Sequence, residues 1–126
     1  MREILFRGKT EDGKWVEGFY LNRSNDKEDI HCIMEKFPVT VSKRVLPETV
    51  GQFTGLLDRY GKKIFEGDIV DILTESEEIG VVAYDDGGFW VNADGFCVDF
   101  HSNINGTDLE VIGNIHDNPE LVEVAR

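Results

Sequence analysis

The segment 52–72, with the sequence QFTGLLDRYGKKIFEGDIVDI, constrains the fold more than any other part of the chain. It separates three apolar, β-type segments by two tight-turn sequences. Asp58 and Gly61 occupy the first and last positions that a type I turn prefers. Gly67 can take a positive φ without steric cost, and the β-branched residues after it suit a half-buried strand. The segment therefore predicts strands folded back on each other, and its second turn is similar to turns of small SH3-like barrels, which is an analogy of fold alone.

Alternation of apolar and polar residues runs through the rest of the chain and indicates a mainly β protein. An α+β assignment stays open, but with very little helix, because few residues follow the predicted helix start at Asn118 and Pro119. The predicted strands are 3–7, 15–21, 30–35, 39–45, 53–57, 63–65, 69–72, 79–84, 89–92, 96–100 and 109–115.

A chain of 126 residues is long enough for one modest core, and we expect a single domain over 1–126. A weaker subdivision falls near Leu46, where a loop sequence precedes the central segment. It separates an N-terminal β subdomain, residues 1–46, from a predicted SH3-like β-barrel, residues 47–126.

The net charge of −12 is distributed very unevenly along the chain. Residues 1–63 hold 12 Lys and Arg against 10 Asp and Glu, whereas residues 64–126 hold one Arg, Arg126, against 15 Asp and Glu. A solvated acidic surface explains this pattern most simply, and an acidic face for a basic protein partner is the functional alternative. Contact of the acidic half with nucleic acid is disfavoured, because phosphate binding needs Lys and Arg.

Several blocks of the sequence resemble the YopX family of phage and prophage proteins. The central block, TGLLDRYGKKIFEGDIV, is the most specific of them. The resemblance implies a phage or prophage context and carries over no catalytic residue. The other blocks are MREILFR with Trp15 after a Gly-Lys turn, GVVAY with DGGF in residues 80–89, and EVIGNI with NPEL in residues 110–121.

The chain holds no strong signature of a metal, cofactor or catalytic site, and we expect none of them. His31 with Cys32, and Cys97 with Asp99 and His101 on one strand face, are the nearest approach to a metal site. The paired Cys and His clusters that structural zinc usually takes do not occur. A hydrolase using Glu66 and Asp68, with Asp71 nearby, is the weakest of three functional hypotheses, because a turn between solvated carboxylates explains these residues equally well.

The composition is typical of a cytoplasmic protein, and the resemblance to the YopX family implies a bacterial host cell. No apolar run approaches the ~20 residues of a membrane span, and the N-terminus has no apolar core of a secretory signal. The two cysteines, Cys32 and Cys97, leave a disulfide open, although two buried thiols are the simpler expectation in this compartment.

The leading functional hypothesis is a non-enzymatic protein that binds another protein or self-associates. Arg59, Tyr60 and Lys62 are the candidate contact residues, because they stand exposed on the first predicted turn. Unpaired strand edges offer a second route to an oligomer. The alternative is a nucleic-acid-associated module in which Arg59–Lys63 contact phosphates and bases stack on an aromatic ring.

Overall fold

The computed structural model describes residues 4–35, 41–73, 78–85, 87–93, 96–99 and 105–123. These residues confirm the prediction of a mainly β protein, with antiparallel strand pairs and one short α-helix among them. None of the helices described is long and apolar enough to cross a membrane. The strands are β1 (Phe6–Lys9), β2 (Trp15–Asn22), β3 (His31–Glu35), β4 (Val41–Arg44), β5 (Gly51–Leu57), β6 (Lys63–Phe65), β7 (Asp68–Ile72), β8 (Ile79–Asp85), β9 (Gly88–Ala93), β10 (Phe96–Asp99) and β11 (Leu109–Asn114). The helical segments are η1 (Pro47–Thr49), η2 (Gly106–Asp108) and α1 (Glu120–Glu123).

The chain divides into two compact units, residues 1–53 and 54–126. Strand β5 leads from the first unit into the second. Its beginning, Gly51 and Gln52, pairs with β1, and its later residues run beside β6. The first unit has 9 Lys and Arg against 9 Asp and Glu, and the second has 4 against 16. The whole net charge of −12 therefore belongs to the second unit.

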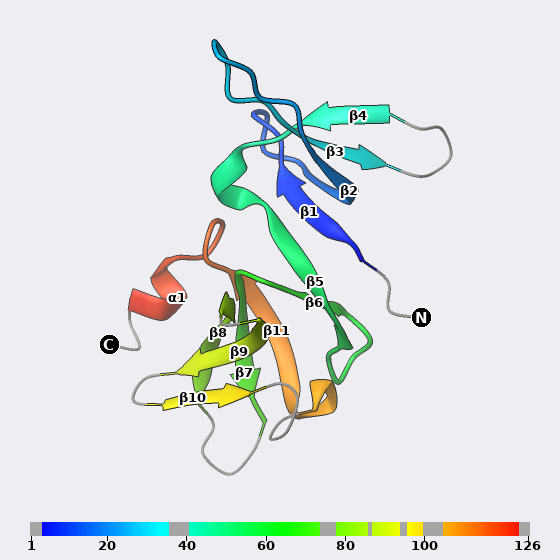
Figure 1. The fold of residues 1–126 in the computed structure, drawn as a ribbon. Coiled ribbons are helices and arrows are strands. Elements are labelled where there is room, and N and C mark those ends of the chain that lie inside the picture. Colours follow the sequence, from blue (N-terminus) through cyan, green and yellow to red (C-terminus); the bar gives the residue numbers. More distant parts are fainter. Residues whose placement is uncertain are drawn as a thin grey trace. The chain divides into compact units, whose positions relative to one another are not determined.

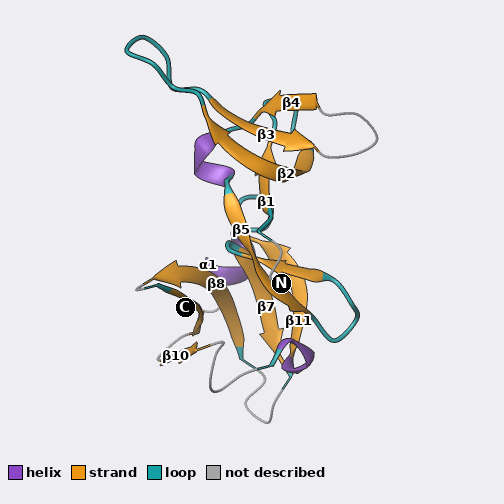
Figure 2. Cartoon of the chain, turned by 45° about the vertical axis from the view of Figure 1, so that its right-hand side comes forward, coloured by secondary structure: helices purple, strands orange, loops and turns teal. Residues whose placement is uncertain are grey.

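The first unit contains the strands in the order β4-β3-β2-β1-β5. One side of the sheet is apolar, where Val16, Ile33 and Val45 form a buried cluster with Phe6 and Tyr20 against it. The loop between β2 and β3 extends beyond the sheet, as Figure 2 shows in teal. Its two sides are joined by a hydrogen bond from the Arg23 N–H to the Ile30 carbonyl.

The second unit contains a five-stranded sheet in the order β10-β9-β8-β7-β11 (Figure 1). One face of this sheet packs against apolar side chains from β5 and β6, so the core lies between two β layers. The buried cluster consists of Ile64, Val70, Ile72, Val82, Val91 and Leu109, with Leu56, Ala93 and Val111 packed against it.

The predicted SH3-like barrel is not found, because no sheet of the described residues closes on itself. In the second unit β10 and β11 form the two opposite edges of the five-stranded sheet, whereas a barrel requires its first and last strands to pair. Turn sequences specify which neighbouring strands fold back on each other. They do not specify whether the outermost strands meet, and that is where the prediction was wrong.

Candidate interaction site

The candidate interaction site consists of the first predicted turn, Asp58–Gly61, and the residue after it, Lys62; we call it the Tyr60 turn. The Asp58 carboxylate determines its shape. Its Oδ1 accepts hydrogen bonds from the backbone N–H groups of Tyr60 and Lys62, both at 2.9 Å. Its Oδ2 accepts one from the Val111 N–H on β11, also at 2.9 Å. One side chain thus closes the turn and attaches it to the neighbouring strand.

Backbone bonds fix the remaining part of the turn. The Asp58 N–H donates to the Lys62 carbonyl at 2.7 Å, and the Arg59 N–H donates to the Leu109 carbonyl at 3.0 Å. Gly61 has a φ of 83°, the left-handed conformation that a residue with a Cβ rarely adopts. The Arg59 guanidinium donates through Nε to the Thr107 carbonyl at 3.0 Å, so this cation is held against η2.

In the Tyr60 turn the carboxylate is buried and the aromatic ring is exposed. Asp58 is 4% exposed, whereas Tyr60 is 71% exposed. Burial raises the pKa of the Asp58 carboxyl, but the three backbone N–H donors and the nearby Lys62 charge outweigh burial, so this pKa lies below its ordinary value. Asp58 therefore remains an acceptor at neutral pH, and the turn keeps its shape.

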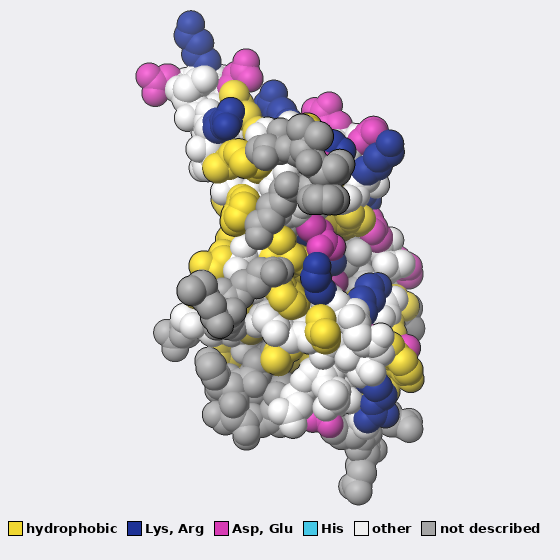
Figure 3. All heavy atoms as spheres, turned by 90° about the vertical axis from the view of Figure 1, so that its right-hand side faces the viewer, with side chains coloured by type: hydrophobic (Ala, Val, Ile, Leu, Met, Phe, Trp, Pro, Cys, Tyr) yellow, Lys and Arg dark blue, Asp and Glu magenta, His cyan; other side chains and the backbone are white. Residues whose placement is uncertain are grey.

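The Tyr60 turn also carries basic side chains in a unit that is otherwise acidic. Among the described residues of the second unit, the Lys and Arg side chains are those of Arg59, Lys62 and Lys63. The face drawn in Figure 3 shows Lys and Arg side chains standing singly among acidic and uncharged ones, without a continuous basic patch. The three predicted contact residues, Arg59, Tyr60 and Lys62, are therefore brought together and exposed, in a small cationic group.

The carboxylates of the hydrolase hypothesis lie in the second turn. Asp68 is 1% exposed, and its Oδ2 accepts a hydrogen bond from the Phe65 N–H at 2.7 Å. Gly67, with a φ of 92°, donates to the Val82 carbonyl and accepts from the Ile115 N–H. Glu66 is half-buried beside it. Asp68 thus holds a turn in the interior, out of contact with any substrate in solution.

His31, the first histidine of the metal hypothesis, contacts two side chains of its own unit. His31 Nδ1 lies 2.5 Å from the Tyr20 hydroxyl, and its Nε2 lies 2.7 Å from Asp29 Oδ1. Burial and the nearby Asp29 charge raise the pKa of Tyr20, so this phenol keeps its proton at neutral pH. No local sequence pattern predicts this contact of Tyr20, His31 and Asp29.

The other residues of the metal hypothesis are Cys32, Cys97, Asp99 and His101. Among the residues that the structure describes, no three His, Cys, Asp or Glu side chains are grouped to hold a metal ion. His101 lies outside the described residues. Cys32 is buried and Cys97 is exposed, and both are free thiols. The disulfide that the sequence left open is therefore not formed, and the expectation of two buried thiols is wrong for Cys97.

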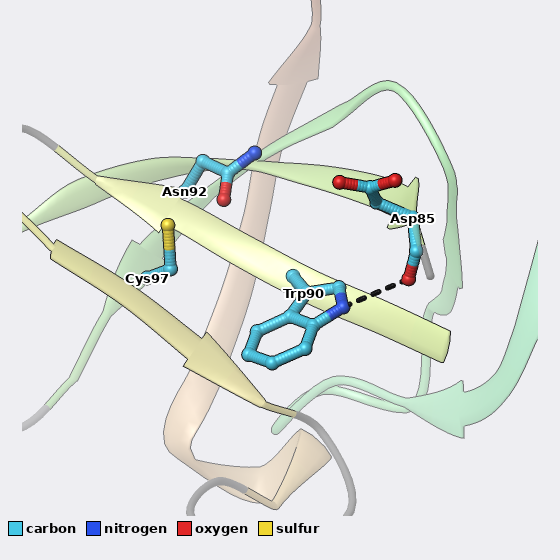
Figure 4. A pocket seen from close by; sticks show the side chains of 4 residues that line it. All are labelled: Asp85, Trp90, Asn92 and Cys97. Carbon is cyan, nitrogen blue, oxygen red and sulfur yellow. Dashed lines mark hydrogen bonds between the residues drawn. The ribbon is translucent and has the colours of Figure 1, made fainter. Parts of the chain in front are cut away.

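A second candidate site was missed by the sequence reasoning. Asp85, Trp90, Asn92 and Cys97 line a hollow of about 260 Å³ on the five-stranded sheet, called the Trp90 hollow below (Figure 4). Trp90 and Asn92 alternate on β9 with the buried Phe89 and Val91, and Cys97 pairs with Asn92 across β10. Alternation along β9 is a signal that puts Trp90 and Asn92 on one face, but only the strand register adds Cys97.

The fold and the site define a small antiparallel β protein of two sheets that displays a basic, aromatic turn. The chain belongs to the YopX family: the family described as YopX protein matches residues 5–123, nearly the whole sequence.

The chain is also similar to a solved protein structure, that of protein EF1440 from Enterococcus faecalis. The two are 26% identical with a TM-score of 0.58, and the match covers 97% of this chain and 99% of the other. A search of the curated proteins finds no match. The comparisons therefore establish the family and a shared fold.

Proposed function

We propose that this protein works by binding another protein through the Tyr60 turn, and that it catalyses no reaction. The observation that carries the proposal is an aromatic ring, 71% exposed, on a turn whose backbone is fixed by a buried carboxylate. A pre-shaped turn loses little conformational freedom on binding. Tyrosine and arginine are enriched among the residues that dominate protein interfaces.

The partner's surface is acidic in this proposal. Lys62 and Lys63 are exposed beside Tyr60, and charges of opposite sign across an interface guide association. A second copy of the chain has a surface of this kind, because its second unit carries a net −12. A homo-oligomer is thus one form of the proposal, and an acidic phage or host protein in the bacterial cytoplasm is the other.

Tyr60→Ala tests the proposal, with Tyr84→Ala as a matched change of another exposed aromatic residue of the second unit. Sedimentation velocity over a range of concentrations measures self-association. Cross-linked capture from host cells, followed by titration of the purified partner, measures binding to another protein. We expect Tyr60→Ala to weaken one of these associations by about tenfold or more, as for a central interface aromatic, and Tyr84→Ala to leave it unchanged. The proposal would be refuted if the protein stayed monomeric at every concentration and if no captured partner bound the Tyr60→Ala variant more weakly than the wild type.

Nucleic acid is the second candidate partner, and burial of the nearby acids supports it. Asp58 and Asp68 flank the basic residues in the sequence, but both are buried and accept backbone N–H bonds. Because both carboxylates are buried, neither lies at the surface against a phosphate that contacts Lys62 or Lys63. At low salt, where phosphate contacts are strongest, retarded migration of labelled DNA or RNA that is lost in a Lys62→Ala/Lys63→Ala variant would favour this alternative. Unretarded migration at low salt would exclude it.

A further inference from the structure

The Trp90 hollow combines groups that suit a positive ligand. Trp90 provides an indole whose Nε1 already donates to the Asp85 carbonyl at 3.0 Å, so its N–H is satisfied and the ring is held in place. The Asp85 carboxylate and the Asn92 amide have no hydrogen-bond or ion-pair partner among the residues described. Figure 4 shows both side chains at the hollow, with the Cys97 sulfur on the adjacent strand.

The negative charge around the hollow favours a ligand with a positive charge. The second unit carries a net −12, and a field of one sign concentrates ions of the opposite sign. Phosphates and carboxylates are therefore repelled from Asp85. A cation gains from the carboxylate and also from the indole, because tryptophan is the aromatic side chain that attracts cations most strongly.

The volume of the hollow indicates what kind of molecule carries the cation. It measures about 260 Å³, whereas pockets that enclose a drug-sized ligand measure about 300–1,000 Å³. This space suits a small cationic group, such as the end of a long side chain, and not a drug-sized ligand.

We propose that the Trp90 hollow binds the guanidinium or ammonium end of an Arg or Lys side chain of a partner protein. The cation lies against Trp90, donates hydrogen bonds to the Asp85 carboxylate and the Asn92 carbonyl oxygen, and contacts the Cys97 thiol at one end. This contact is independent of the Tyr60 turn, since the two sites have no residue in common.

Titration with N-acetylarginine amide, followed by NMR of the Trp90 indole N–H and the Asn92 and Cys97 amides, tests the proposal. N-acetylcitrulline amide is the matched probe, because it has nearly the same shape without the charge. We expect saturable shifts at these residues with the arginine probe, and binding about tenfold weaker with the citrulline probe, as for loss of a charge-assisted hydrogen bond. Equal binding of the two probes would overturn the proposal.

Two variants locate the binding. Asp85→Asn removes the carboxylate charge at an exposed position, and Glu110→Gln removes one charge from β11, at the far edge of the same sheet. Asp85→Asn should weaken arginine binding about tenfold, and Glu110→Gln should have little effect. Equal weakening by both would mean diffuse attraction to an acidic surface and would refute a specific site.

A comparison of methylguanidinium with the peptide Gly-Arg-Gly distinguishes a free cation from a protein side chain. If both bind with similar affinity, the hollow accepts a cation that is attached to a peptide backbone, as proposed. If methylguanidinium binds and the peptide is excluded, the natural ligand is a free small cation, and the proposal of a protein partner fails.

Discussion

Asp58 shows how one buried side chain can determine a surface. Its carboxylate is satisfied by three backbone N–H groups, two in its own turn and one on β11. The sequence identified Asp58 as a turn residue from its position before Gly61. It could not reveal the bond to Val111, because that bond joins residues separated by 53 positions. The local part of the site was predictable, and its attachment to the sheet was not.

Replacement of this carboxylate should destabilise the protein in a pH-dependent way. Asp58→Asn places an amide where the Val111 N–H needs an acceptor, and we expect a loss of about 2 kcal/mol in the free energy of unfolding at pH 7, as for a hydrogen bond to a charged group. The folded-state pKa of Asp58 is lowered, so the wild-type advantage is present above the unfolded value of about 3.9 and is lost as pH falls through the folded value.

Urea denaturation at neutral pH and at about pH 3 measures this difference. The gap between wild type and Asp58→Asn should narrow in acid. Asp85→Asn is the control, because Asp85 is exposed and its side chain has no partner among the residues described. A gap that stays constant between the two pH values would contradict the assigned role of the charge.

Alanine substitutions at Gly61 and Gly88 distinguish the cost of backbone strain from the cost of a steric clash. A Cβ at Gly61 or at Gly88 would meet no atom within 4 Å, but only Gly61 of the two has a positive φ, at 83°. Gly61→Ala should therefore cost about 1–2 kcal/mol through the left-handed conformation, whereas Gly88→Ala in β9 should be neutral or slightly stabilising. Thermal unfolding of the two variants checks this, and equal effects would contradict it.

At the scale of elements, local pairs were predictable and distant pairs were not. The expected hairpin of residues 79–84 and 89–92 is found as β8 and β9, because its turn and alternation lie within one short stretch. The pairing of β7 with β11 brings Asp68 beside Asn114, and no local pattern indicates it. The Trp90 hollow was missed for another reason: β9 and β10 are neighbours in the chain, but only their exact register places Cys97 opposite Asn92.

The end of β11 illustrates a side chain with a different role from the predicted one. Asn118 was expected to cap a helix, and α1 begins at Glu120. The Asn118 side chain turns back instead, and its Oδ1 accepts a hydrogen bond from the Asn114 N–H at 3.3 Å. Asn114 is buried, and its Oδ1 accepts hydrogen bonds from the N–H groups of His116 and Asp117. These bonds form a tight turn after the last strand.

Removal of the Asn118 side chain should loosen this turn. We expect Asn118→Ala to lower the free energy of unfolding by about 1 kcal/mol, the usual contribution of one hydrogen bond. Asn118→Asp keeps an acceptor oxygen and should retain most of the stability. Chemical denaturation compares the two, and an Asp variant as unstable as the Ala variant would refute the role of Oδ1.

At the scale of the whole molecule, the charge imbalance has a structural cost. Glu110 on β11 lies directly opposite Asp71 on β7, and like charges in that position repel. The sequence predicted an acidic second half from composition. The structure shows that two of these acids face each other within one sheet, so some of the repulsion is intramolecular.

Reversal of one of these charges should stabilise the protein. Glu110→Lys replaces a repulsive cross-strand pair by an attractive one, and we expect a gain of about 0.5 kcal/mol at low ionic strength. Added salt should reduce the gain, because it screens exposed charges. Glu110→Gln should give a smaller gain. Thermal unfolding at low and high salt measures these differences, and destabilisation by Glu110→Lys would show that Glu110 has another contact.

The division of labour within the Tyr60 turn has an evolutionary consequence. Asp58 and Gly61 set the backbone, and the side chains of Tyr60 and Lys62 project from it without a hydrogen bond to it. Residues at those two positions can therefore diversify while the scaffold remains intact. We expect members of one lineage to acquire new binding specificities by substitutions at the tip of this loop, with the residues at its base kept.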